Sequence, residues 1–390
     1  MRFTYKTTIF ACFVGYIAQA IVNNFLPLLF ITFQNSFAIP LSRITLLVTV
    51  NFGTQLMVDL LSAGFIDRIG YRCSIVLAHV FYTAGLVLLT ILPGVMDPYA
   101  GILISVIVYA IGGGIIEVLV SPIMESCPTD NKEKAMSLLH SFYCWGHVGV
   151  VLLSTMFFQI FGIHNWPVLA LLWAIVPLIN ALVFLKTPIA PLIAGNQHGM
   201  TVRQLCRSGT FWLLMLMMLC AGASEQAVSQ WASAFAELGL GLSKAAGDLA
   251  GPMTFAIMMG LSRAAYGKYG DRLDLNRFMT GSSLLCVLSY LLVSLSPSPL
   301  LSMAGCALCG LSVGIMWPGT FSRAAVSLKN GGTAMFALLA LSGDLGCSAG
   351  PTLAGFVSGI AGDNLNTGIL AAIVFPAVML ACLCIKRNPS

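Results

Sequence analysis

The chain has 390 residues, of which 58% are hydrophobic and only 8% are charged. A soluble domain carries roughly 25% charged residues, so most of the surface of this chain must face lipid. The net charge of +5 does not indicate a nucleic-acid partner, because the basic residues are scattered between apolar runs and form no tract. No Walker sequence for ATP is present, and we expect no cofactor.

Twelve apolar segments are long enough to cross a membrane, which takes about 20 residues per helix. The longest connection, 187–208, separates an N-terminal bundle (1–186) from a C-terminal bundle (209–390), and we expect it to be a cytoplasmic linker. The sequence thus predicts an all-α membrane protein of twelve transmembrane helices in two six-helix halves. The predicted spans are 7–33, 43–66, 73–92, 99–124, 134–160, 166–185, 209–236, 245–267, 277–294, 299–324, 332–360 and 366–385.

The Lys and Arg residues alternate with the predicted spans. If the N-terminus is cytoplasmic, all of the 19 Lys and Arg residues except Arg43 and Lys244 fall at cytoplasmic ends and loops, Arg263 included. Such an excess marks cytoplasmic loops. We therefore expect a multi-pass protein of the cell (inner) membrane with both termini in the cytoplasm.

The first two spans carry amides on faces that could line a water-filled path. Asn51, Gln55 and Asp59 follow one another at intervals of four residues, so they share one face of the second span. Asp59 lies near the cytoplasmic end, which fits a gate or a packing partner better than a solute ligand. The first span would complete the N-terminal half of the path with Gln19, Asn23 and Asn24.

An internal repeat relates the two halves. The pair Asp67-Arg68 recurs as Asp271-Arg272, at the same place in the second half. Parallel repeats related by an axis along the membrane normal place a solute site between the halves at mid-depth. Three more residues of the first half recur in order and at similar spacing: Gly114, Pro122 and Gly146 correspond to Gly310, Pro318 and Gly346.

Glu117 is the clearest ionisable residue within a span. It follows Gly112-Gly113-Gly114, which would let another helix approach closely. A carboxylate within a membrane helix is expensive, at about 2.5–3.5 kcal/mol for Asp on insertion scales, and burial favours its neutral form. We expect Glu117 to couple proton movement to transport. The alternative is a permanently protonated Glu117 that bonds to a neighbouring helix.

Later spans carry further candidates for solute binding. On the fifth span, His140, Tyr143 and His147 form one face, although such histidines can equally be bonded core residues. An aromatic beside amides and carboxylates suits a hydroxyl-rich solute, whose ring has an apolar face and polar edges. The alternative for each is helix–helix packing. These candidates lie on the seventh, tenth and eleventh spans and are Glu225, Gln226, Trp231, Trp317 and Asp344.

The loop after the second span resembles a known signature. Asp67-Arg68-Ile69-Gly70-Tyr71-Arg72 is similar to the G-x-x-x-D-R-x-G-R-[RK] loop of the major facilitator superfamily, and Gly267-Lys268-Tyr269-Gly270-Asp271-Arg272 is its second copy. The resemblance implies the twelve-helix fold of secondary transporters. It also implies a gating role for the charged residues of the two loops, which we expect to control alternation between states. These residues are Asp67, Arg68, Arg72, Asp271 and Arg272.

A narrower resemblance is to the fucose permease branch of sugar:proton symporters. It rests on the Asn23-Asn24 pair, on Gly114, Glu117 and Pro122 of the fourth span, and on a G-L…P-x-x-F-S pattern in the tenth. Pro27 stands where the fucose member has a membrane Asp, so the coupling scheme carries over only in part.

Together these features predict a monomeric secondary active transporter that imports a small polar solute, a sugar or similar, with protons. The alternative is a proton-coupled exporter of drugs or metabolites. We do not expect an enzyme, because no nucleophile–base pair or metal cluster lies near one membrane face. Cys306 and Cys309 have the spacing of half a zinc site, but no second pair completes it, and no metal is expected.

Topology is directly testable. Reporter fusions at either terminus and within 187–208 should report a cytoplasmic position, because nearly all Lys and Arg residues fall on that side. Activity of a periplasmic reporter at either terminus would rule out the twelve-span arrangement.

Overall fold

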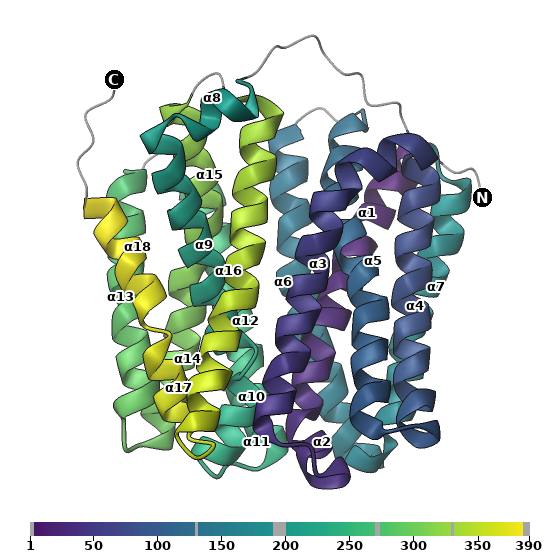
Figure 1. Ribbon diagram of the computed structural model, residues 1–390, viewed down its shortest axis with the longest axis vertical. Coiled ribbons are helices and arrows are strands. Elements are labelled where there is room, and N and C mark those ends of the chain that lie inside the picture. Colours follow the sequence, from purple (N-terminus) through teal and green to yellow (C-terminus); the bar gives the residue numbers. More distant parts are fainter. Residues whose placement is uncertain (1–3, 129–131, 190–199, 270–273, 329–330, 385–390) are drawn as a thin grey trace. The chain divides into compact units, whose positions relative to one another are not determined.

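The computed structural model describes residues 4–128, 132–189, 200–269, 274–328 and 331–384, which are almost entirely helical (Figure 1). Within these ranges, ten helical segments are long and apolar enough to cross a membrane. The protein is an all-α membrane protein, as predicted. The segments 245–267 and 332–360 are also helical, so the count of twelve spans stays a prediction that is consistent with the ten.

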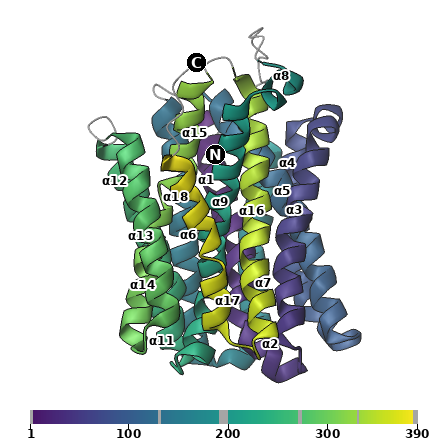
Figure 2. The same ribbon diagram turned by 60° about the vertical axis from the view of Figure 1, so that its left-hand side comes forward.

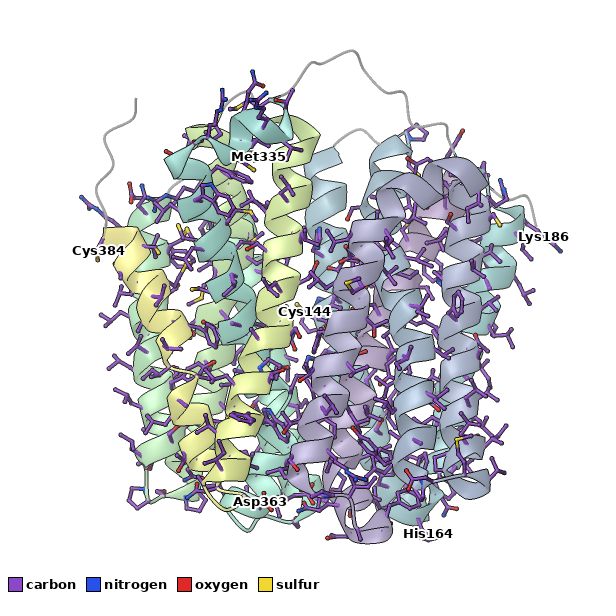
Figure 3. All side chains as sticks on the ribbon, viewed as in Figure 1. Cys144, His164, Lys186, Met335, Asp363 and Cys384 are labelled. Atoms are coloured by element: carbon purple, nitrogen blue, oxygen red, sulfur yellow. The ribbon has the colours of Figure 1, made fainter. Side chains whose placement is uncertain are left out.

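The chain divides into two compact units, and the first comprises Met1–Ala194. Its first span continues through a 3-10 turn, Leu26–Leu29, which contains Pro27, a residue without a backbone N–H. Figure 3 shows Lys186 and His164 at opposite ends of this unit. The helices of the first unit are α1 (Tyr5–Phe25), α2 (Phe30–Phe37), α3 (Leu41–Ile69), α4 (Tyr71–Val95), α5 (Pro98–Ser126), α6 (Lys132–Phe161) and α7 (Trp166–Lys186).

The second unit comprises Gly195–Ser390. Here several predicted spans are interrupted helices: the tenth breaks at residues 314–315, just before Trp317-Pro318, and π-helical segments occupy Phe235–Gly239 and Leu249–Met253. Figure 2 shows α13 and α14 side by side. The helices are α8 (Val202–Cys206), α9 (Gly209–Ser229), α10 (Ala232–Ala234), α11 (Lys244–Asp248), α12 (Thr254–Tyr269), α13 (Leu275–Leu295), α14 (Pro299–Val313), α15 (Met316–Ser327), α16 (Gly332–Ile360), α17 (Leu365–Ala371) and α18 (Val374–Cys384).

Glycines of the internal repeat perform the same task in both units. In the first, Gly114 of α5 lies against the backbone carbonyl of Gln55 on α3, so that a Cβ would lie 2.7 Å from that oxygen. In the second, Gly310 of α14 lies against the carbonyl of Phe255 on α12, and a Cβ there would clash. Each glycine thus allows the close approach of one corresponding pair of helices, α3 with α5 and α12 with α14.

A second corresponding pair of glycines joins the first predicted span of each half to the fifth, α1 to α6 and α9 to α16. Gly146 of α6 faces Ile17 of α1, where an added Cβ would lie 3.0 Å from the Cα atom. Gly346 of α16 lies directly against the carbonyl oxygen of Leu219 on α9. The expected two-fold repeat is therefore visible as repeated helix packing.

The contact at Gly346 gives a matched test of this packing. Gly346→Ala should destabilise the protein by about 1–3 kcal/mol, because the new methyl group would overlap the Leu219 carbonyl. Gly281→Ala on α13 is the control, since nothing lies within 4 Å of its Cβ position and alanine favours helix by about 1 kcal/mol. Thermal unfolding in detergent measures both. Equal melting temperatures for the two variants would contradict the packing role.

Candidate functional site

Glu117 on α5 receives a hydrogen bond from a buried amide of α1. Gln19 Nε2 lies 2.6 Å from Glu117 Oε2. Gln19 is buried, whereas Glu117 is half-buried. One turn along α5 and α1, the Tyr16 and Ser121 hydroxyls lie 3.2 Å apart. The carboxyl that the sequence singled out thus belongs to a polar contact between two spans.

The glycine run beside Glu117 makes room for a neighbouring polar side chain. A Cβ on Gly113 would lie 2.8 Å from Cδ of Gln55, so a larger residue there would require the Gln55 amide to shift. Gln55 Nε2 donates to Asn23 Oδ1 at 2.9 Å and to Asn51 Oδ1 at 3.2 Å. Asn51 Nδ2 in turn donates to Asn23 Oδ1 at 3.2 Å. The predicted amide faces of the first two spans therefore meet in one hydrogen-bonded cluster.

The candidates on α6 lie in different surroundings. Tyr143 is half-buried, and its hydroxyl lies 3.4 Å from Asn24 Nδ2, which also bonds the Ala20 carbonyl. His140 is exposed, with its ring 5.3 Å from the Tyr16 ring. His147 is buried.

In the second unit, Glu225 forms an ion pair that the sequence did not predict. Its Oε2 lies 3.3 Å from Nη2 of Arg263 on α12, with the two side chains 9% and 18% exposed. Arg263 was assigned to the cytoplasmic end of its span, and no basic group was expected beside Glu225. That assignment was incomplete, because a long arginine side chain can reach from one end of a helix toward its middle while its Cα stays near the end.

Two other candidates of the second unit, Trp231 and Gln226, form hydrogen bonds within that unit. Trp231 is fully buried, and its indole N–H donates to the Pro351 carbonyl at 2.9 Å. Gln226 Oε1 accepts from Gln230 Nε2 at 3.1 Å, one turn along the same polypeptide run. These contacts suit a structural role for Trp231 within this unit.

Trp317 lies where α15 meets α16. It is half-buried, forms an edge contact with Phe321 at 6.3 Å between ring centroids, and lies so close to Gly343 that a Cβ there would clash. Asp344, the next residue on α16, is 9% exposed.

Of the predicted gating residues, Arg72 has a clear local task. Its Nη1 donates to the carbonyls of Phe184 and Leu185 at 2.9 and 2.8 Å, which are among the last carbonyls of α7. Asp59 is half-buried on α3. The side chains of Asp67 and Arg68, and the whole of Asp271 and Arg272, lie outside the described residues.

A polar cluster that sequence reasoning missed lies around α11. The Ser233 hydroxyl donates to Asp248 Oδ1, and Lys244 Nζ lies 3.1 Å from Asp248 and 3.3 Å from Glu237. Asp248 is completely buried. The four-residue spacing of Lys244 and Asp248 was the available signal. No group of three or more metal-ligating side chains occurs within the described ranges.

Among the described residues, ten membrane-length helices, repeated helix packing and polar contacts between spans are compatible with a transporter, and a comparison with known families decides the class. A family model described as the Major Facilitator Superfamily matches residues 8–351. The chain belongs to this superfamily. It is accordingly a membrane transporter, as the loop signature predicted.

Several solved transporter structures are similar to this chain over nearly its whole length. A D-xylose-proton symporter matches with a TM-score of 0.81 at 10% identity, covering 98% of each chain. A bacterial homologue of the human lysosomal transporter Spinster matches at 0.76 and 13%, covering 98% of each. The fucose:proton symporter of E. coli matches at 0.68 and 16%, covering 98% of this chain and 99% of the other. A comparison with curated proteins finds no match.

The ion pair in the second unit can be tested by stability. Arg263→Gln should destabilise the protein by about 3–5 kcal/mol, because it leaves a buried carboxylate without its counter-charge. The double variant Arg263→Gln/Glu225→Gln should recover much of the loss, since neither buried charge then remains. Thermal unfolding of purified protein in detergent gives the comparison. A double variant no more stable than the single one would argue against the pair.

Proposed function

We propose that this transporter carries a small polar solute, a sugar, together with protons by alternating access, with Glu117 as the proton-coupling group. The observation that carries the proposal is the bond from the neutral Gln19 amide to Glu117. Two of the similar structures, described as fucose:proton and D-xylose-proton symporters, lend support to the solute class and the coupling ion.

The choice of Glu117 over Glu225 rests on their partners. An arginine stabilises an ionised carboxylate, so Glu225 beside Arg263 is poorly suited to release and regain a proton. A neutral amide can accompany either form of Glu117. Glu225 and Arg263 are better suited to hold α9 and α12 together, and Asp344 remains the second candidate for a proton carrier.

We propose the solute contacts from the polar character of the side chains on these helices. Amides and ring hydroxyls can pair with sugar hydroxyls as donors or acceptors, whereas a site for apolar drugs would be dominated by aromatic and Met side chains. The cluster of Asn23, Asn51 and Gln55 shows that amides of separate spans converge. Further proposed contacts are Gln19, Asn24, His140, Tyr143, His147, Gln226, Trp317 and Asp344.

The gating assignment is part of the same proposal. We place alternation between states on Asp59 and on the two loop signatures, Asp67-Arg68 and Asp271-Arg272. A carboxylate at a helix junction can bond helix N-terminal amides or arginines and hold one side closed. The protein would act as a monomer in the cell membrane, with no cofactor.

The transported solute can be found with proteoliposomes. Uptake of labelled L-fucose, D-xylose, D-glucose and D-galactose should be measured with and without an inward proton gradient. Accumulation of one of them that depends on the gradient is the expected result. Gradient-dependent efflux of dyes with no sugar uptake would favour the exporter instead.

Glu117→Gln should abolish uphill accumulation of the transported sugar, because the variant mimics the protonated form and cannot release a proton. Counterflow exchange should stay measurable, since exchange needs no net proton release. Asp344→Asn and the double variant Glu225→Gln/Arg263→Gln are the controls, since Glu225→Gln alone would leave Arg263 without its counter-charge. If Glu117→Gln accumulates sugar and one of the controls does not, the coupling role passes to the carboxyl that this control lacks.

A further inference from the structure

The bond between Gln19 and Glu117 uses only one side of the Gln19 amide. Nε2 donates to the carboxyl at 2.6 Å. Gln19 is only 3% exposed, and its Oε1 is enclosed without a hydrogen-bond partner among the described residues. A buried acceptor that lacks a donor is unfavourable, so the site would be stabilised by a donor at Oε1 or by a different orientation of the amide.

A side-chain amide has two orientations of nearly equal shape. The oxygen and the NH₂ group of glutamine exchange places on a half-turn about its last torsion, which is broad and roughly two-fold. An ionised carboxylate only accepts hydrogen bonds, so it selects the orientation with Nε2 facing Glu117. A protonated carboxyl gains an O–H donor, and that donor can be accepted by Oε1 after the half-turn.

We propose that the Gln19 amide is a two-position switch that responds to the protonation of Glu117. The switch determines whether the carbonyl oxygen or the NH₂ group of Gln19 faces away from Glu117. With Glu117 ionised, Nε2 bonds the carboxylate and the Gln19 carbonyl faces away. With Glu117 protonated, its O–H bonds Oε1 and the NH₂ group faces away. The proton enters and leaves Glu117 from water, and Gln19 neither gains nor loses one. This inference rests on the proposed proton exchange at Glu117.

The switch has a consequence for the class of solute. An oxygen that carries only lone pairs, such as a sugar ring oxygen or a carbonyl, can pair with an NH₂ group but not with a carbonyl oxygen. The end of the Gln19 amide that faces away from Glu117 can therefore bond such an oxygen only when Glu117 is protonated. A transporter built this way binds proton and solute together, which is the requirement for symport.

Other titratable side chains lie on the helices packed against α5, and their titration must be separated from that of Glu117. They come from each helix packed against α5: Tyr82 on α4, Asp59 on α3, Tyr16 on α1, and Tyr143 and His140 on α6. Asp59→Asn and His140→Gln are therefore included as background variants in the test.

The test is a pH-step infrared difference measurement on the purified protein, with the side-chain carbonyl of glutamine isotopically labelled. In the wild type, the step should change a carboxyl band and a labelled amide band together. Gln19→Met should keep the carboxyl change and lose the amide change, and Glu117→Gln should lose both. Gln230→Met, Asp59→Asn and His140→Gln should keep both. An amide change that persists in Gln19→Met would overturn the switch.

Solute binding gives the second arm. The affinity of wild type for L-fucose or D-xylose should rise by about tenfold between ionised and protonated Glu117, roughly the effect of one hydrogen bond. In Gln19→Met this rise should disappear, and in Gln19→Asn, whose amide is too short to reach, it should disappear as well. A full pH dependence in both would refute the inference. If none of the four sugars of the uptake panel binds the wild type, the sugar proposal fails, and the infrared result still decides on the switch.

Discussion

Close approach of helices at small residues is the constraint on which the polar contacts of this protein depend. In lipid there is little hydrophobic drive for helices to associate, so packing at glycines and hydrogen bonds between spans carry much of the association. Gly146 lets α6 approach α1, and Gly113 admits the Gln55 side chain against α5. A larger residue at Gly146 would press on the α1 backbone at Ile17, and one at Gly113 would displace the Gln55 amide.

The two units share this packing and differ in the charges placed on it. Gly114 and Gly310 each lie against a backbone carbonyl of a neighbouring helix, yet Glu117 in the first unit accepts a bond from the neutral Gln19 amide, while Glu225 in the second pairs with an arginine. A neutral setting leaves a carboxyl free to exist in two protonation states, whereas an ion pair holds it in one. The repeat thus combines the same helix packing with different partners for the carboxyl of each unit.

Much of this could be predicted from the sequence. Apolar length gave the helices to within a few residues, and four-residue spacing placed Asn51 and Gln55 on one face, which the structure confirms. The partners across helices could not be predicted, because periodicity does not fix how neighbouring helices rotate against each other. The pairing of Arg263 with Glu225 was missed for this reason, since counting charges does not show which neighbouring helix a long side chain meets. The hydrogen bond from Trp231 to the Pro351 carbonyl of a neighbouring helix could not be predicted for the same reason.

The polar residues of α11 and α12 bear on how the protein is made. Lys244 and Arg263 each pair with a carboxylate that lies earlier in the chain, Glu237 and Glu225, and Asp248 accepts a bond from Ser233. A nascent segment carrying these charges enters a bilayer poorly alone. Its partners are already synthesised when it leaves the ribosome, so α12 is expected to enter the membrane with help from Glu225 of α9, which neutralises Arg263. Biogenesis of the second half would then depend on the order in which its spans are translated.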